Sequence, residues 1–102
     1  MSKQHYFASC WAAWSVGSTP EEATSRLARY VGTSIWKGSK AGEHKGLRCM
    51  LLLVDAPLDA DYQINNFTPQ GVRIAEGHEV VVETMKGRYR TLKQLTIHNG
   101  TN

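Results

Sequence analysis

The sequence has few of the features that reveal a function directly. Its 102 residues contain only two cysteines and three prolines, and no apolar run approaches the roughly 20 residues that span a bilayer. Cys10 and Cys49 both lie in apolar, strand-like segments, which favours buried reduced thiols over a disulfide or a reactive nucleophile. The first residues lack the charged start, apolar stretch and small-residue cleavage site of a secretory signal. We therefore expect a cytoplasmic protein that does not contact a membrane.

Motifs for metal binding and catalysis are missing as well. The four histidines do not form a His-x-x-x-His pair, and the two cysteines do not form Cys-x-x-Cys. The turn carboxylates Asp55, Asp59 and Asp61 lack the glycine-containing pattern of a calcium loop. The sequence therefore predicts no metal ion, no cofactor and no catalytic residue. It favours a non-catalytic protein while leaving enzymatic activity open.

A segment rich in glycine and lysine spans residues 36–46. It lacks the Gly-Lys-Ser/Thr of a P-loop, and an apolar strand follows it where a P-loop would continue into a helix. We interpret it as a mobile basic loop, with a looser anion-binding loop as the alternative. Its lysines are Lys37, Lys40 and Lys45.

The most distinctive stretch that the chain does contain is residues 6–16, which carry four aromatics and no charge. If this stretch is one strand, its even positions, which include Trp14, form an unbroken apolar face. Its odd positions place Phe7 and Trp11 among small residues on the other face. Both faces of such a strand need cover.

A clear helix start follows this stretch. Thr19 is a suitable N-cap, Pro20 suits the first helical position, and Glu22 completes a capping box. Apolar residues then recur at helical spacing as far as Val31, and Gly32 is a typical stop. We expect a helix over residues 19–31.

The remaining segments are typical of strands. Residues 47–54 form a strongly apolar strand that we place at the centre of the sheet, paired with the first strand. Residues 62–75 hold weak strand signals among turns, and residues 79–84 and 88–97 form a hairpin. The sequence predicts one α+β domain over residues 1–102. In it, a single helix packs on one face of a four- to five-stranded, mostly antiparallel sheet.

This architecture leaves one sheet face without cover, because a helix of about 20 Å covers one face only. Phe7 and Trp11 on that face are the predicted protein interface, toward a partner protein or a second copy in a homodimer. Our first hypothesis is therefore a non-catalytic binding protein. Closure of the late hairpin over this face, which would form a small barrel, is the alternative that needs no partner.

The charge distribution supports a second hypothesis, a nucleic-acid-binding accessory protein. Residues 84–102 carry four basic residues and no acid, and a basic strand face beside aromatic rings suits phosphates and bases. The predicted contacts are Lys86, Arg88, Arg90 and Lys93. Residues 55–83 hold six acids and one arginine, so the alternative is that acidic and basic segments lie side by side and neutralise each other.

The tryptophans support a third hypothesis, a small-molecule-binding protein or an enzyme. Ligand pockets are mostly lined by apolar and aromatic side chains. The predicted lining consists of Trp11, Trp14 and Trp36.

Overall fold

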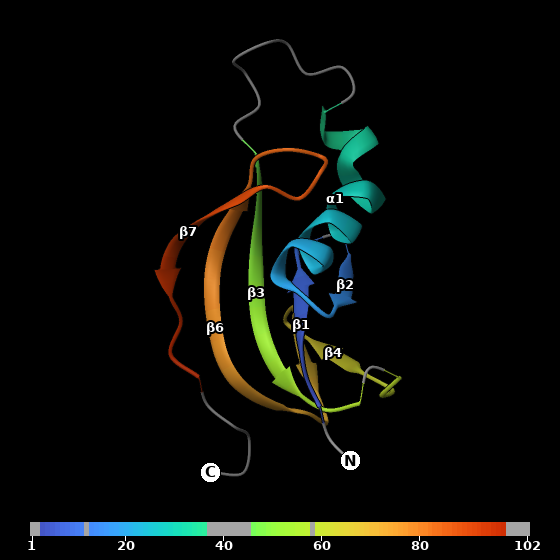
Figure 1. Cartoon of the computed structure of the whole chain (residues 1–102), viewed down its shortest axis with the longest axis vertical. Helices are drawn as coiled ribbons and strands as arrows, with labels where there is room; N and C mark the ends of the chain where they lie inside the picture. Colours follow the sequence, from blue (N-terminus) through green and yellow to red (C-terminus); the bar gives the residue numbers. More distant parts are fainter. Residues whose placement is uncertain (1–2, 12, 37–45, 58, 98–102) are drawn as a thin grey trace.

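The computed structural model describes residues 3–11, 13–36, 46–57 and 59–97, with the backbone only for residues 32–36. One helix packs on a five-stranded antiparallel sheet of order β2-β1-β3-β6-β7, and β4 and β5 form a separate hairpin (Figure 1). This confirms the predicted α+β fold class and the central place of β3 beside β1. The elements are β1 Gln4–Ser9, β2 Trp14–Gly17, α1 Pro20–Trp36, β3 Leu47–Asp55, β4 Gln63–Asn65, β5 Thr68–Gln70, β6 Arg73–Val82 and β7 Tyr89–Gln94.

The single strand predicted over residues 6–16 is wrong, because the chain folds back on itself there. The Cys10 amide donates a 2.9 Å hydrogen bond to the Ala13 carbonyl, and β1 pairs with β2 as an antiparallel hairpin. An apolar run without glycine, proline or charge is compatible with one long strand and with a hairpin, so its pattern does not reveal the turn. Because of the turn, Trp14 lies on the same sheet face as Phe7, and the two rings stack with centroids 5.3 Å apart.

The predicted N-terminus of α1 is confirmed, and its predicted end at Val31 is wrong. The Glu22 amide donates to the Thr19 hydroxyl at 3.0 Å, and the Glu22 carboxylate accepts from the Ser18 amide at 3.2 Å. The helix continues through Gly32 to Trp36. One glycine costs a helix only about 1 kcal/mol, so it is a weak stop signal when helix-compatible residues follow.

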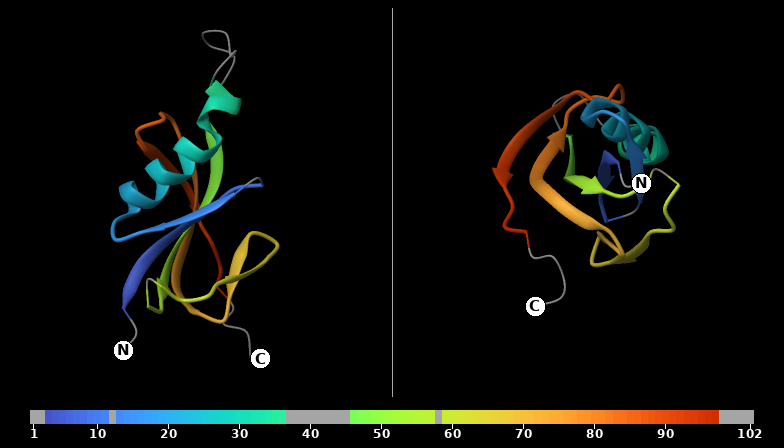
Figure 2. Two further views of the ribbon diagram at one scale, coloured as in Figure 1. Left: turned by 90° about the vertical axis from the view of Figure 1, so that its right-hand side faces the viewer. Right: turned by 60° about the horizontal axis from the view of Figure 1, so that its bottom comes forward.

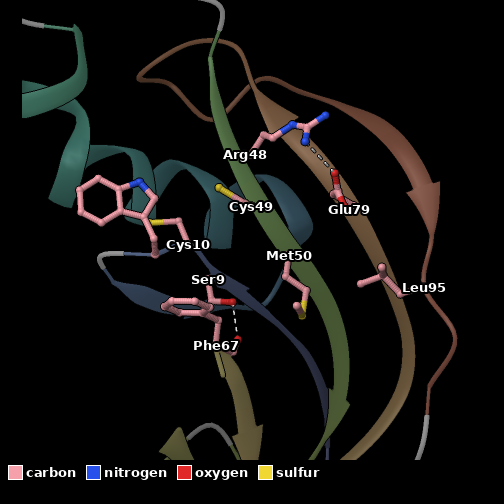
Figure 3. Close-up of a pocket in the computed structure, with 9 residues that line it drawn as sticks. Ser9, Cys10, Arg48, Cys49, Met50, Phe67, Glu79 and Leu95 are labelled. Atoms are coloured by element: carbon pink, nitrogen blue, oxygen red, sulfur yellow. Dashed lines mark hydrogen bonds and ion pairs between the residues drawn. The ribbon is translucent and has the colours of Figure 1, made fainter. Parts of the chain in front are cut away.

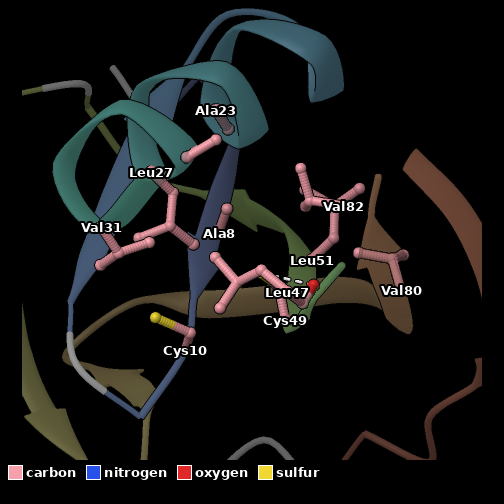
Figure 4. Packing of buried hydrophobic residues seen from close by; sticks show 11 residues of the cluster. Ala8, Cys10, Ala23, Leu27, Val31, Leu47, Cys49, Leu51, Val80 and Val82 are labelled. Atoms are coloured by element: carbon pink, nitrogen blue, oxygen red, sulfur yellow. Dashed lines mark hydrogen bonds between the residues drawn. The ribbon is translucent and has the colours of Figure 1, made fainter. Parts of the chain in front are cut away.

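The main core lies between the helix and the sheet. Ala23 and Leu27 point from α1 toward Ala8, Leu51 and Val82, and Figure 4 shows these apolar side chains converging. This contact closes one face of the sheet, as the sequence predicted.

The opposite sheet face, which we call the open face, is only partly covered. Here Phe7, Leu52 and Val54 form a second buried cluster. Tyr62, just before β4, packs on Phe7 with ring centroids 5.7 Å apart, and its hydroxyl donates to His5 Nε2. The β4–β5 hairpin therefore covers one end of this face, and Figure 2 shows it at the end of the molecule away from the far end of α1. The late β6–β7 hairpin extends the sheet at its edge, and Leu95 and Ile97, which follow β7, pack against this cluster.

Two strand assignments also differ from the prediction. Residues 68–70, read as a turn, form β5, and β6 begins at Arg73, six residues before the predicted start. A register shift between Glu79 and Val80 lets this long strand bend as it pairs with β7. The bend contributes to the curvature of the sheet (Figure 2).

Candidate functional site

Four exposed apolar side chains gather at the ends of two hairpins, and we call this group the aromatic patch. Its members are Trp11, Trp14, Ile64 and Phe67, which are 73%, 39%, 40% and 46% exposed. They surround a depression of about 200 Å³. Six large hydrophobic side chains are exposed among the described residues, so the patch holds most of them.

The tip of the β4–β5 hairpin has a strained backbone that presents Phe67. Asn66 and Phe67 have φ angles of 53° and 69°, the left-handed conformation that a two-residue type I′ turn requires. Asparagine adopts this conformation readily, whereas a phenylalanine there costs on the order of 1–2 kcal/mol. Backbone strain of this kind gathers at functional sites, so the exposed Phe67 ring points to a role at the surface.

A buried hydroxyl joins the two hairpins. Ser9, 2% exposed at the end of β1, donates a 2.6 Å hydrogen bond to the Phe67 carbonyl. This bond is drawn in Figure 3. It fixes the tip of one hairpin beside the turn of the other, and so it fixes Phe67 relative to Trp11.

A pocket of about 290 Å³ adjoins the patch and shares Trp11 and Phe67 with it. Figure 3 shows Cys49, Met50 and Leu95 along its sheet side. The Arg48 guanidinium and the Glu79 carboxylate also line it, 3.6 Å apart. The pocket is therefore apolar and sulfur-rich, with a charged pair at one side.

The two thiols in this pocket are structural. Cys10 and Cys49 are 5% and 4% exposed and are present as thiols, as the sequence predicted. Burial, followed by the neighbouring Cys10, raises the pKa of the Cys49 thiol from 9.0 to about 12. Cys49 therefore stays protonated at neutral pH, which makes it a poor nucleophile and a poor metal ligand.

Charges of both signs alternate on the open face beside the pocket. Glu79 lies 3.6 Å from Arg48 and 3.7 Å from Lys93, and Glu83 lies 3.8 Å from Arg90. Residues paired across strands share a face, so these groups form one row. In this row the basic C-terminal segment lies beside the acidic segment that precedes it, and their charges pair. This is the alternative in which the two segments neutralise each other.

The four predicted nucleic-acid contacts do not form one surface. Arg90 and Lys93 lie on the open face, whereas Lys86 lies beside Ser25 and Arg29 of the helix. Arg88 precedes β7 in the turn, where its amide donates to the Thr84 hydroxyl. The hairpin turn separates residues that are neighbours in the sequence.

The two residues of the predicted protein interface, Phe7 and Trp11, also lie in different surroundings. Phe7 is fully buried under Trp14 and Tyr62, so it is not available to a partner, while Trp11 is the most exposed member of the patch. Trp11 and Trp14, two of the three tryptophans predicted to line a pocket, both line the depression of the patch. The side chain of Trp36 lies outside the described residues, as do Lys37, Lys40 and Lys45.

Sequence reasoning missed Ile64 and Phe67, which come from a hairpin read only as a weak strand followed by turns. The missed signal was Asn66, because asparagine at the centre of a short turn favours a two-residue hairpin loop. Their approach to Trp11 depends on the Ser9–Phe67 contact across 58 residues, which no local pattern reveals.

Comparison with known proteins gives no further guidance to this site. Searches against family models, curated proteins and solved structures found no match.

Within the described residues, no three or more His, Cys, Asp or Glu side chains group so as to hold a metal ion. No helix in this part of the chain is long and apolar enough to cross a membrane.

Proposed function

We propose that this is a non-catalytic binding protein that contacts a protein partner through the aromatic patch and its adjoining pocket. The observation that carries the proposal is the gathering of Trp11, Trp14, Ile64 and Phe67 around one hollow at two hairpin tips. Scattered exposed hydrophobics need no explanation, whereas a contiguous apolar patch of a few hundred Å² is often functional.

The composition of the surface is that of a protein interface. The patch exposes on the order of 400 Å² of apolar surface, which is comparable to the apolar centre of a small interface. Arg48 and Glu79 line the adjoining pocket, and Lys93 pairs with Glu79, so charged groups border the apolar surface. An aromatic centre with a polar rim is the usual anatomy of such contacts.

The same rim argues against nucleic acid as the partner. A phosphate backbone needs an excess of positive charge, whereas Arg48 and Lys93 both pair with Glu79, and Arg90 pairs with Glu83. A small ligand is the remaining alternative, and the pocket of about 290 Å³ lies at the lower limit of the usual range for ligand sites.

The two thiols support a cytoplasmic location for this binding protein. Cys10 and Cys49 are both buried as thiols, and reducing compartments keep cysteines in that form.

Photo-crosslinking tests the proposal. Benzoylphenylalanine replaces either Trp11 or Tyr30, a helix residue that is 70% exposed and serves as the matched control. We expect crosslinked protein adducts from position 11 and none of the same mass from position 30. The adduct is identified by mass spectrometry, and the purified partner must then lose at least about tenfold affinity for the Trp11→Ala variant. Equal adducts from both positions, or adducts to nucleic acid alone, would contradict the proposal.

A further inference from the structure

A second hollow lies on the sheet face that carries the helix, beside the first turn of α1. The lower ends of β3 and β6 in Figure 1 extend past the start of the helix, and the hollow lies where they do so. It has a volume of about 200 Å³. We call it the tyrosine hollow, and its lining includes Tyr6, Pro20, Leu53, Glu76, His78 and Tyr89.

The register of the strands places a carboxylate in this hollow. Leu53 of β3 pairs with Tyr6 of β1 on one side and with Glu76 of β6 on the other, so the three side chains share one face. Leu51, two residues before Leu53, belongs to the core under the helix, which identifies this face as the helix side.

The negative charge of Glu76 has no lysine or arginine beside it within the described residues. Its carboxylate lies 3.4 Å from His78 Nε2, and a neutral imidazole leaves that charge in place. Glu79 of the same strand, by contrast, lies 3.6 Å from Arg48 and 3.7 Å from Lys93. None of the described residues that line the hollow is a lysine or an arginine. The hollow therefore favours a cation.

Two phenols and a second carboxylate lie around the same space. Burial, followed by the nearby charge of Glu21 and then by Tyr6, raises the pKa of the Tyr89 hydroxyl. Tyr89 is therefore a neutral phenol at neutral pH, and its oxygen can accept a hydrogen bond, as can that of Tyr6. The influence of Glu21 places the carboxylate of the first helical turn close to these acceptors.

The start of α1, which meets the hollow at Pro20, does not suit an anion. Helix starts bind anions through free backbone amides, and proline has no amide hydrogen. The Glu22 amide donates to the Thr19 hydroxyl at 3.0 Å. The Ala23 amide donates to the Thr19 carbonyl at 3.1 Å. These amides are already occupied, and the acidic first turn offsets the positive end of the helix dipole.

We propose that the tyrosine hollow binds a primary alkylammonium group, with the nitrogen toward Glu76 and the two phenol oxygens. A primary ammonium has three N–H donors and suits a set of separate oxygen acceptors. Leu53 and Pro20 supply aliphatic surface for the carbon chain. A cavity of about 150 Å³ already holds benzene, so about 200 Å³ has room for a four-carbon amine.

Titration of the ¹⁵N-labelled protein with butylammonium chloride, followed by NMR at pH 7, tests this inference. We expect the amide signals of Tyr6, Glu76 and Tyr89 to shift and to saturate with a dissociation constant on the order of millimolar. Butanol has the same chain without the charge, and tetramethylammonium has the charge without N–H donors. Each should bind at least about threefold more weakly.

Two matched variants locate the charge that is recognised. Glu76→Gln should weaken butylammonium binding at least about threefold, because it keeps the shape of the side chain and removes its charge. Glu83→Gln removes a carboxylate of similar exposure, 42% against 50%, that pairs with Arg90 instead, and it should leave the affinity unchanged. Circular dichroism confirms that both variants are folded.

The same assay separates the two sources of such a group. Tighter binding of 1,4-diaminobutane than of butylammonium supports a free amine, and tighter binding of a lysine blocked at both ends supports a lysine side chain of another protein. Shifts no larger than those from sodium chloride at equal ionic strength, or an unchanged affinity of Glu76→Gln, overturn the proposal. The tyrosine hollow shares no lining residue with the depression of the aromatic patch, so this failure leaves the proposed function standing.

Discussion

Gly87 holds the β6–β7 turn against the helix, and its replacement is a sharp test of the packing. Its φ is +91°, and its carbonyl accepts a 2.8 Å hydrogen bond from the buried Thr24 hydroxyl. A Cβ added at Gly87 would lie 2.6 Å from the backbone nitrogen of Ser25. The turn therefore touches the helix backbone directly, with no space for a methyl group.

Gly71 is a matched control for this substitution. Its φ is +82°, and a Cβ added there would meet nothing within 4 Å. We expect Gly71→Ala to lower the free energy of unfolding by about 1–2 kcal/mol, the cost of a left-handed backbone alone. Gly87→Ala adds overpacking of about 1–3 kcal/mol, so its total cost is about 2–5 kcal/mol.

Urea unfolding followed by far-ultraviolet circular dichroism measures the difference. Both variants are compared with the wild type at one pH, and their m-values should agree, because the surface exposed on unfolding is unchanged. A gap below about 0.5 kcal/mol between Gly87→Ala and Gly71→Ala would refute the close approach of turn and helix.

Three further predictions follow from buried polar groups. Because the folded pKa of the Cys49 thiol is raised from 9.0 to about 12, its stabilising effect is complete below pH 9 and is lost as pH rises toward 12. The stability difference between wild type and Cys49→Ala should fall by about 2–3 kcal/mol between pH 8 and pH 11, and a constant difference in urea titrations would contradict this. Ser9→Ala removes the bond to the Phe67 carbonyl. It should cost about 1 kcal/mol and speed amide exchange in the β4–β5 hairpin, and unchanged exchange there would count against the link. Thr24→Val leaves the Gly87 carbonyl without its side-chain donor and should cost about 1–3 kcal/mol in urea unfolding, whereas Thr24→Ser, which keeps the hydroxyl, should cost less.

Local signals made the helix start and the central strand predictable. Thr19 and Glu22 are three residues apart and interact within one turn, so their pattern has the same meaning in any fold. The apolar run of β3 needs burial on both faces, which places it in the middle of a sheet. In both cases the deciding interactions are short in sequence or follow from hydrophobicity alone.

The turn after Ser9 was not predictable in the same way. The residues around it carry none of the glycine, proline or asparagine that usually marks a turn, so periodicity alone continued the strand. This single error exchanged the roles of two tryptophans. The sequence pattern placed Trp11 with Phe7, whereas the turn places Trp14 on Phe7 and leaves Trp11 outside.

The burial of Phe7 and the exposure of Trp11 are thus consequences of one turn. Trp14 and Tyr62 cover Phe7, so the Trp11 ring does not pack on Phe7 and stays exposed. The tip of the β4–β5 hairpin, held by Ser9, brings Phe67 to the hollow that Trp11 lines. The patch therefore exists only while that hairpin is docked on the sheet. Any partner that binds the patch must stabilise the docked hairpin by the same free energy with which docking favours binding.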